Sequence, residues 1–279
     1  MKYIIWGGTG WIGQMIVNLI SASDVDTVYV AKSRLENYYD IIKELEEIKP
    51  DRVLNCAGIT GTPNVDWCEN NSQKTFFVNV IGIGNLAHAC WTLDIHLTNY
   101  SSGCIYNYDF DHPIGKGFTE LDYPNFEVST YSKSKVLAEK FLEVYPNVLT
   151  LRIRLPISDD KTSKNLLIKL SKFNKVINIP NSVTILPELL PISLDMSKKQ
   201  IIGKYNFVNP GAITHPEILE LYKEYIDENL EWGIFTEKEQ NGMMQTRRCN
   251  CELDVSKLTD MYEIKDAKDS LREILQKMK

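Results

Sequence analysis

The sequence has none of the features that mark membrane-spanning, secreted or nucleic-acid-binding proteins. Its apolar runs fall well short of the ~20 residues that a bilayer-spanning helix needs, and its N-terminal "KYIIW" is too short for a signal peptide. No block of about five like charges occurs, and the net charge of −6 is opposite in sign to that of a nucleic-acid-binding surface. We therefore expect neither a membrane nor a nucleic acid as a partner.

Cysteine is sparse and scattered. The six cysteines are Cys56, Cys68, Cys90, Cys104, Cys249 and Cys251. They form no Cys-x-x-Cys pair and no grouping with histidine, which argues against a metal site and against a disulfide framework. With no signal peptide, this pattern predicts a reducing, cytoplasmic location.

What the sequence does contain is an alternation of strand and helix patterns. The 279 residues, 43% of them hydrophobic, suffice for one sizeable domain with a smaller lobe. Strand patterns occupy residues 3–6, 27–31, 52–58, 96–102 and 148–156, and helical patterns occupy residues 11–23, 38–50, 71–93 and 131–146. Such alternation predicts an α/β fold, a Rossmann-type doubly wound parallel sheet covered on both faces.

The pattern loosens after Pro156, where a proline-rich stretch follows. A late strand is expected at residues 204–210, and a helix at residues 214–227 with Thr214 as its N-cap. We therefore expect a cofactor-binding domain at residues 1–155 and a smaller substrate-binding lobe at residues 156–279, interleaved with the end of the sheet.

Three glycines, Gly7, Gly10 and Gly13, lie at the junction of the first strand and the first helix. Glycines there make a tight turn, allow the backbone to approach a pyrophosphate and place that anion at a helix N-terminus. We predict a dinucleotide site with the following cofactor-binding residues: Gly7, Thr9, Gly10, Trp11, Ile12, Gly13, Ala57 and Gly58.

The end of the second strand bears on the choice of cofactor. NAD-specific proteins commonly place an acid there to hold the ribose hydroxyls, but this sequence has Lys32, Ser33 and Arg34. A basic pair suits a 2′-phosphate, so NADPH is favoured over NADH, with Ser33 and Arg34 as binding residues. The alternative interpretation is a solvated charged loop.

A tyrosine and a lysine, Tyr131 and Lys135, are four residues apart at the start of a predicted helix. This spacing places both side chains on one helix face, where an ammonium group favours ionisation of the phenol. The glycine turn, Asn79, the Ser101–Ser102 pair and then this Tyr-x-x-x-Lys resemble, in that order, the extended short-chain dehydrogenase/reductase superfamily. The resemblance implies that Ser102 binds the reacting carbonyl, Tyr131 donates the proton, and Lys135 also holds the nicotinamide ribose.

Five further segments narrow the resemblance. They are "NCAGITGTPNVDWCE" (55–69), "SSGCIYNYDFDHPIGKGF" (101–118), "LRIRLPIS" (151–158), "VINIPNSVTILPELLPIS" (176–193) and "YNFVNPGAITHPEILELYKEYID" (205–227). They resemble the bifunctional nucleotide-rhamnose synthases, UDP-4-keto-6-deoxy-glucose 3,5-epimerase/4-reductases best known from plants. One departure is Ser102, where the plant pattern has threonine. The resemblance implies an oxidoreductase and isomerase that acts on UDP-4-keto-6-deoxy-glucose, forms UDP-L-rhamnose and is a homodimer.

Two reactions at one site require acid/base groups beyond those of a reductase. A C4 ketone acidifies the protons on C3 and C5, and inverting both centres needs a group to remove a proton and another to return one. Cys104, two residues beyond Ser102, is one candidate, and the resemblance implies Lys169 as the other. Cys68 is a rival thiol, although we favour a packing role for it. The substrate-binding residues are expected to be Asn64, Ser102, Gly103, Cys104, Asn165, Lys169 and Arg247.

Arg247 is the arginine expected to pair with the nucleotide diphosphate, because guanidinium groups bind such anions in a fork geometry. His112 and His215 are assigned structural or capping roles, since no acid partner is evident for either. Two other functions remain open: a 4-keto-sugar reductase without epimerase activity, and a non-catalytic dinucleotide-binding regulatory subunit. UDP and dTDP substrates are both compatible with these motifs.

Overall fold

The computed structural model describes residues 1–62 and 64–279 of the chain. They divide into two compact units, each assembled from three stretches of sequence. The first unit comprises Met1–Ile105, Phe126–Leu151 and Pro191–Tyr205, and the second comprises Tyr106–Asn125, Arg152–Leu190 and Asn206–Lys279.

A six-stranded sheet organises the first unit. Its strand order is β2-β1-β3-β4-β5-β9, formed by β1 (Lys2–Trp6), β2 (Thr27–Val30), β3 (Arg52–Asn55), β4 (His96–Ser102), β5 (Val148–Ile153) and β9 (Gly203–Asn206). The pairs β1–β2, β1–β3 and β3–β4 are parallel. The strand order changes direction between β1 and β3, the position at which doubly wound sheets bind their ligands. The α/β doubly wound fold predicted from the sequence is confirmed.

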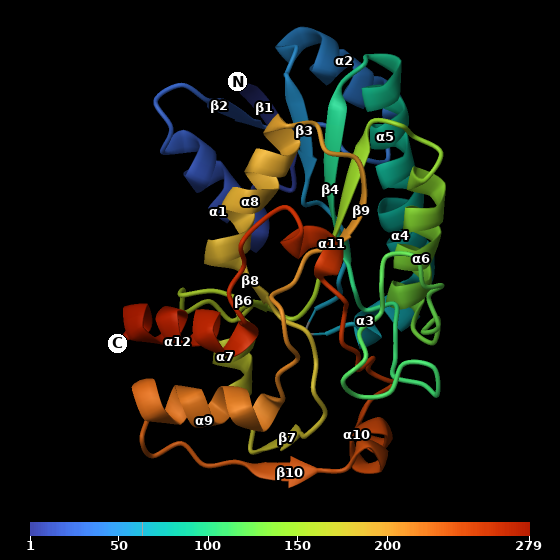
Figure 1. Ribbon diagram of the computed structural model, residues 1–279. Coiled ribbons are helices and arrows are strands. Elements are labelled where there is room, and N and C mark those ends of the chain that lie inside the picture. Colours follow the sequence, from blue (N-terminus) through green and yellow to red (C-terminus); the bar gives the residue numbers. More distant parts are fainter. Residues whose placement is uncertain (63) are drawn as a thin grey trace. The chain divides into compact units, whose positions relative to one another are not determined.

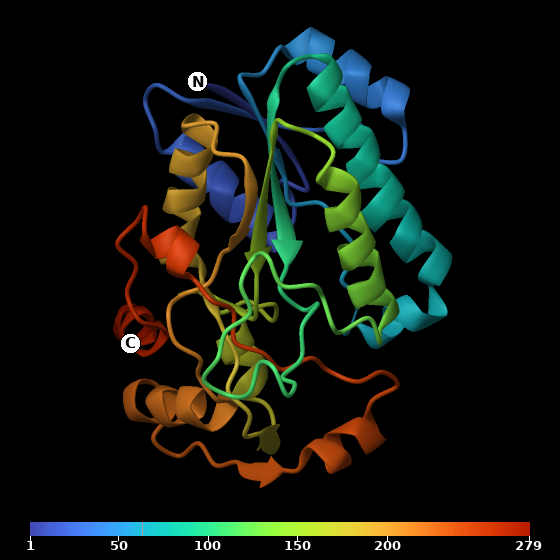
Figure 2. The same cartoon turned by 45° about the vertical axis from the view of Figure 1, so that its right-hand side comes forward.

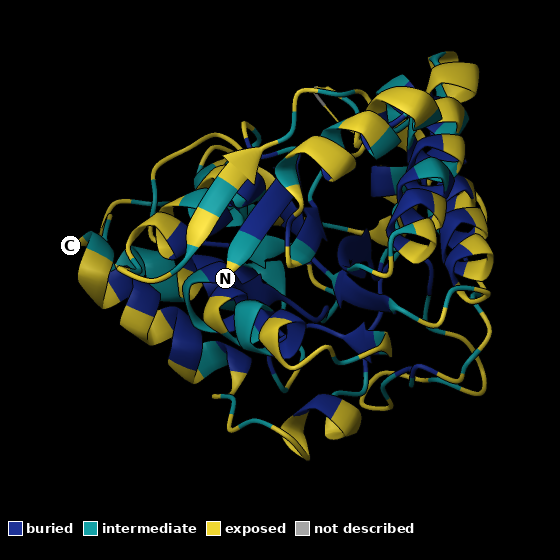
Figure 3. Cartoon of the chain, turned by 90° about the horizontal axis from the view of Figure 1, so that it is seen from above, coloured by how far each residue is buried: buried dark blue, intermediate teal, exposed yellow. Residues whose placement is uncertain are grey.

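Helices cover both faces of this sheet (Figures 1 and 2). The helices of this unit are α1 (Trp11–Ser21), α2 (Tyr38–Ile48), α3 (Asp66–Asn70), α4 (Ser72–Phe76), α5 (Ile83–Thr92), α6 (Thr130–Leu142) and most of α8 (Leu186–Lys198). Helices α2, α5 and α6 pack side by side on one face, and α1 lies on the other (Figure 2). The helices bury one side and expose the other (Figure 3), as expected for helices that cover a sheet.

The single helix predicted over residues 71–93 is interrupted by a π-helical segment. Between α4 and α5 the chain forms η1 (Phe77–Gly82), which contains the buried side chain of Asn79. One extra residue per turn is rarely tolerated in a helix without a functional or packing reason. Here the wider turn places the Asn79 amide against the loop after β3 and against helix α6.

The second unit has small sheets and its own core. Its elements are β6 (Pro156–Ile157), α7 (Leu166–Leu170), β7 (Lys175–Ile177), β8 (Thr184–Ile185), α9 (His215–Tyr225), β10 (Gly233–Phe235), α10 (Glu237–Met243), α11 (Ser256–Thr259) and α12 (Ala267–Met278). Strands β6 and β8 are paired and parallel, as are β7 and β10. Helix α9 begins with a capping box formed by Thr214 and Glu217, so the predicted N-cap is correct.

Each unit has a separate apolar core. In the first unit, β1, β3, β4, α2 and α5 contribute, with Ile4, Ile41 and Leu86 fully buried. In the second unit, α9 and α12 pack their buried residues with those of β8, among them Ile218 and Leu271. The sequence predicts that residues 1–155 bind the cofactor and that residues 156–279 bind the substrate. This assignment stays a prediction. Among the described residues, none of the helices has the length and hydropathy of a membrane-crossing segment.

Candidate active site

The glycine turn brings the ends of β1 and β3 together. Gly7 has φ +76°, and a Cβ on it would lie 2.5 Å from the backbone nitrogen of Ala57. A Cβ on Gly13 would lie 2.1 Å from the carbonyl oxygen of Gly7. No side chain fits at either position, because backbone atoms occupy the space. Gly10 is the N-cap of α1 and has no side-chain cap, which leaves the helix N-terminus for a ligand.

This turn fits a dinucleotide, since the backbone is bare at the switch point of the sheet and a helix N-terminus opens there. The other residues predicted to bind the cofactor lie around it. Thr9 is exposed, Trp11 and Ile12 are half-buried in the first turn of α1, and Gly58 follows Ala57 after β3. The structure therefore brings the predicted cofactor residues of the first unit to one edge of the sheet, and their roles stay predictions.

The turn after β2 is held in place by an acid that the sequence analysis missed. The Glu44 carboxylate of α2 accepts hydrogen bonds from the backbone N–H groups of Lys32 and Ser33, each at 2.8 Å. The Trp6 indole donates to the Ser33 carbonyl oxygen at 3.2 Å. The Ser33 hydroxyl is buried without a hydrogen-bond partner in the described chain, whereas Arg34 is exposed. Of the two donors in this turn, the Arg34 guanidinium group is the exposed one and suits a phosphate, whereas the Ser33 hydroxyl lies below the surface.

A chain of serines ties the end of β4 to the start of α6. The Ser102 hydroxyl accepts a hydrogen bond from the backbone N–H of Cys104 at 3.1 Å. Ser129, the N-cap of α6, donates to the Ser132 hydroxyl at 2.9 Å, and Ser132 in turn donates to the Cys104 carbonyl oxygen at 2.7 Å. These bonds hold Ser102 and Cys104 beside the helical turn that contains Tyr131.

The start of α6 is also fastened from α3. The Glu69 carboxylate accepts from the Thr130 backbone N–H at 2.8 Å and from the Thr130 hydroxyl at 2.7 Å. A carboxylate is favourable at this position, because the N-terminus of a helix carries partial positive charge. Sequence reasoning did not find Glu69, although it belongs to the "VDWCE" segment that carried the family resemblance. Glu69 precedes Thr130 by 61 residues, so no local spacing pattern in the sequence indicates that the two are in contact.

Tyr131 and Lys135 share one face of α6, as their spacing predicts. The Lys135 Nζ lies 5.8 Å from the centre of the Tyr131 ring, and Tyr131 is 8% exposed. A Cβ on Gly58 would lie 3.3 Å from this Nζ, so the amine also borders the turn after β3. Burial lowers the pKa of Lys135 to about 8, while Glu139 acts in the opposite direction.

Asn79 is a residue whose contacts, unlike its presence, the sequence did not reveal. Its side chain accepts from the Ile59 N–H at 2.8 Å, and its Nδ2 donates both to the Ile59 carbonyl at 2.9 Å and to the Ser134 hydroxyl at 3.1 Å. One amide thus links the loop after β3 to α6. The sequence order of motifs indicated Asn79, but not this link.

In the second unit, Lys169 and Asn165 lie on and before the short helix α7. Although Lys169 as a whole is exposed, partial burial of its amine and, secondly, the nearby Lys164 lower its pKa. Arg247 is also exposed, in the loop after α10. The pairing of Lys169 with Cys104, which belongs to the first unit, stays a prediction.

The structure gives Asn165 a role that the sequence did not predict. Asn165 is fully buried, and its Oδ1 accepts from the N–H groups of Ser158 and Leu167. Its Nδ2 donates to the carbonyl oxygens of Ser158 and Asp160, each at 2.7 Å. Asn165 therefore holds the loop before α7 in place, and its predicted contact with substrate remains a separate prediction. Asn64 is exposed and accepts from the Asp66 N–H at 2.8 Å.

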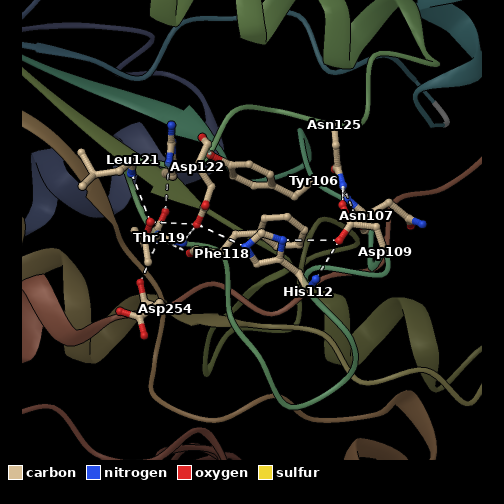
Figure 4. A network of polar contacts seen from close by, with 12 residues as sticks. Tyr106, Asn107, Asp109, His112, Phe118, Thr119, Leu121, Asp122, Asn125 and Asp254 are labelled. Carbon is tan, nitrogen blue, oxygen red and sulfur yellow. Dashed lines mark hydrogen bonds and ion pairs between the residues drawn. The ribbon is translucent and has the colours of Figure 1, made fainter.

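His112 has acid partners, so the expectation that none exists is wrong. Its Nδ1 lies 3.4 Å from Asp109 and its Nε2 lies 3.4 Å from Asp122 (Figure 4). The imidazole stacks on Phe118 with ring centres 4.0 Å apart, and Phe118 stacks on Tyr106 at 4.5 Å. Asp109 and Asp122 are 13 residues apart in the sequence, and the fold of the loop brings both of them to the His112 ring. No local sequence pattern indicates this arrangement.

His215, the first residue of α9, is the group from which we expect the clearest pH dependence of stability. Its Nε2 is buried without a hydrogen-bond partner among the described residues. Burial and then the nearby Arg154 lower the pKa of His215 from 6.5 to about 4. Between these values the unfolded chain binds a proton that the folded chain excludes, so stability falls as the pH falls through this window.

The free energy of unfolding of the parent protein should fall between pH 7 and pH 5. We predict that this fall is smaller by about 2 kcal/mol in His215→Gln. Urea unfolding at both pH values measures this difference. His88→Gln, which replaces an exposed histidine of α5, is the matched control and should leave the pH dependence unchanged. A parental pH dependence in His215→Gln would contradict the prediction.

No group of three or more His, Cys, Asp or Glu side chains positioned for a metal ion occurs within residues 1–62 and 64–279. The thiols of Cys56 and Cys90 are buried, which raises their pKa values. Burial likewise raises the pKa of Cys68, which lies in α3 near Lys135.

The parallel sheet, the glycine turn between β1 and α1, and the Tyr131–Lys135 pair beside Ser102 together define a Rossmann-type short-chain dehydrogenase/reductase. Within this class, the chain belongs to the family described as the RmlD substrate binding domain, whose model matches residues 1–177.

Two curated relatives from Arabidopsis thaliana are similar over almost the whole chain. The first is the bifunctional dTDP-4-dehydrorhamnose 3,5-epimerase/dTDP-4-dehydrorhamnose reductase, 46% identical over 97% of this chain and 91% of that protein. The second is a trifunctional UDP-glucose 4,6-dehydratase/UDP-4-keto-6-deoxy-D-glucose 3,5-epimerase/UDP-4-keto-L-rhamnose-reductase. It is 45% identical over 97% of this chain, which spans only 41% of that longer protein.

Two solved structures are also similar. The UDP-rhamnose synthase of Acanthamoeba polyphaga mimivirus matches with a TM-score of 0.95 and 33% identity over 100% of this chain and 99% of that one. The dTDP-4-dehydrorhamnose reductase of Bacillus anthracis, solved in complex with NADP, matches with a TM-score of 0.82 and 18% identity over 98% and 96%. The resemblance to nucleotide-rhamnose synthases is thereby confirmed.

Proposed function

We propose that this protein converts UDP-4-keto-6-deoxy-D-glucose into UDP-L-rhamnose, by inverting C3 and C5 and then reducing the C4 ketone with NADPH. The observation that carries the proposal is Cys104, two residues beyond Ser102, whose backbone N–H donates to the Ser102 hydroxyl and whose carbonyl oxygen accepts from Ser132 in the helix of Tyr131. A ketone reductase needs no additional proton carrier at that position. The 46% identity to a bifunctional 3,5-epimerase/4-reductase supports the same conclusion.

Epimerisation needs proton removal and proton return on opposite faces of each carbon. Loss of the C3 or C5 proton leaves an enolate that the C4 carbonyl stabilises, and return of a proton to the other face inverts the centre. We assign this exchange to Cys104 and Lys169. A lysine with a lowered pKa has a larger neutral fraction and so a greater capacity to accept a proton.

Reduction is assigned to Ser102, Tyr131 and Lys135. The Ser102 hydroxyl orients the carbonyl oxygen, and the Tyr131 phenol delivers a proton to it as the alcohol forms. The Lys135 ammonium, close to the phenol ring, stabilises the phenolate that remains. Asn79 and Glu69 support this reduction indirectly. Each hydrogen-bonds to α6 and so fixes the position of the helix that carries Tyr131 and Lys135.

The glycine turn, Ser33 and Arg34 would hold NADPH, and the bound cofactor supplies the hydride that reaches C4. The bare backbone at Gly7 and Gly13 and the buried Ser33 hydroxyl support this placement. The dTDP-4-dehydrorhamnose reductase solved with NADP has the same fold, which also supports it.

One assay tests the proposed function directly. Purified protein is supplied with UDP-4-keto-6-deoxy-D-glucose and NADPH, and the product sugar is identified by NMR. UDP-L-rhamnose is the expected product. A 4-keto-sugar reductase without epimerase activity would form a 6-deoxy sugar with unchanged C3 and C5, and a regulatory subunit would consume no NADPH.

Cofactor preference is a separate prediction. The parent protein should bind NADPH more tightly than NADH, and Arg34→Ala should shrink this gap about tenfold, the effect of one charge-assisted contact with a 2′-phosphate. Titration of both cofactors, followed by cofactor fluorescence, measures the ratio. Lys43→Ala removes an exposed cation from α2 and should leave the ratio unchanged. Equal affinities in the parent protein would contradict the argument.

We also propose a homodimer in a reducing, cytoplasmic compartment. Exposed apolar side chains on η1, α5 and α6, namely Phe77, Ile81, Trp91 and Leu137, support a dimer interface on these adjacent helices. All six cysteines carry thiols, which suits such a compartment. Sedimentation analysis should find a dimer for the parent protein and a monomer for Leu137→Glu. A monomeric parent would overturn the dimer.

A further inference from the structure

Helix α6 carries a third side chain in line with Tyr131 and Lys135. Glu139 follows Lys135 by four residues, so the three side chains form a continuous stripe on one helix face. Glu139 is 4% exposed. Glutamate is rarely buried so deeply unless a partner offsets its charge. The proposed reduction does not use this residue.

Ser101, at the end of β4, contacts Glu139 and borders the same small cavity as Lys135. The Ser101 hydroxyl, one residue before Ser102, donates to the Glu139 Oε1 at 3.4 Å. Ser101 and Lys135 also line one small cavity, of about 10 Å³. Apart from Lys135, the side chains that line this cavity are neutral: Asn55, Ala57, Val78, Asn79, Ile83, Asn99, Ser101 and Ala138. The lining therefore contains no anion to offset the lysine charge.

Two acidic groups act electrostatically on the Lys135 amine. Glu139 on the same helix contributes more, and the Cys68 thiol on α3 contributes less. Both favour the ammonium form, against the burial that lowers the pKa of Lys135. Because burial raises the pKa of Cys68, that thiol carries little charge near neutral pH. Glu139 is therefore the main stabilising charge.

We propose that Glu139 is a positioning residue that keeps the Lys135 amine protonated, and so keeps Tyr131 competent as the proton donor through neutral pH. The inference rests on the proposed reduction, because it extends the set of residues that serves Tyr131. Without the carboxylate, the buried amine loses its proton at a lower pH and the phenolate loses its stabilising charge.

The pH dependence of NADPH oxidation tests the proposal. The parent protein and Glu139→Gln are compared from pH 6 to pH 10 with the 4-keto sugar as substrate. The alkaline limb of the profile should move to lower pH by about one unit in Glu139→Gln. Glu143→Gln is the matched control, since Glu143 follows the same helix but pairs with Lys204 at the surface. Its profile should equal that of the parent.

An alkaline limb that stays in place in Glu139→Gln would overturn the inference and leave the proposed function standing. A parent protein that fails to oxidise NADPH with this sugar would overturn the proposed function instead. These two failures are therefore distinguishable.

A stability measurement tests the coupling without any reliance on activity. Glu139→Gln leaves a buried ammonium without its anion, so this variant should melt below the parent protein. Adding Lys135→Met should raise the melting temperature of Glu139→Gln again, since the unpaired charge is then removed. A double variant no more stable than Glu139→Gln would overturn the inference, including in the case where the single variant does not fold.

Discussion

Replacing Cys104 by alanine should stop the exchange of the C3 and C5 protons of the 4-keto sugar into deuterated water. The expected loss is ~10² to 10⁴ in rate, the usual effect of removing an acid/base group. Lys169→Ala should have the same consequence. Rhamnose formation should cease in both variants, whereas NADPH binding should survive, since neither residue belongs to the glycine turn. Proton NMR of the sugar in deuterated water measures the exchange.

Two variants serve as controls for this experiment. Cys90→Ala removes a buried thiol from the core of the first unit, and Lys172→Ala removes an exposed lysine just after α7. Both should exchange the protons at the parental rate. If Cys104→Ala itself exchanges both protons at that rate, Cys104 is a packing residue. Cys68 would then be the next thiol to test, because it lies near Lys135.

Tyr131→Phe should abolish NADPH oxidation and leave proton exchange at C3 and C5 in place. Hydride transfer to C4 produces an alkoxide that must be protonated as it forms, and phenylalanine has no proton to donate. We expect the oxidation rate to fall by ~10² to 10⁴, measured by the loss of NADPH absorbance. Loss of NADPH oxidation with retained proton exchange would show that one site catalyses two separate reactions. Loss of both would indicate a damaged site.

Tyr123→Phe is the matched control, because it removes a phenolic hydroxyl that is 88% exposed in the second unit. It should oxidise NADPH at the parental rate. Parental activity in Tyr131→Phe would show that another group protonates the C4 oxygen, and the Ser102 hydroxyl would be the first candidate.

Local sequence patterns were sufficient for the elements of the sheet and for the motifs at its edge. Strands β1 to β5 and helix α6 follow from period and length alone, because a buried strand and an amphipathic helix differ in their spacing of apolar residues. The tight turn at Gly7 and Gly13 could also be predicted from the sequence. A side chain at either position would collide with backbone, so few other residues could stand there.

The residues that hold the site in place could not be predicted from local sequence patterns. Glu69 caps a helix that begins 61 residues later, and Asn79 reaches Ser134 across 55 residues. The interruption of the helix at η1, which aims Asn79, has no periodic signature in the apolar pattern. Glu44 reaches back from α2 to the turn after β2. Each of these contacts depends on where the chain returns, which spacing along the sequence does not encode.

The division between sequence and tertiary structure at this site therefore follows the range of the interactions. Sequence by itself determined the class of fold, the glycine turn and the Tyr131–Lys135 pair, because each has a spacing pattern within one strand–turn–helix unit or one helix face. Tertiary structure alone decided that His112 lies between two carboxylates and that Asn165 holds its own loop. It also decided that Glu139 is buried beside Ser101 of β4. Burial and charge compensation are properties of the folded environment, so they appear only when distant segments are packed together.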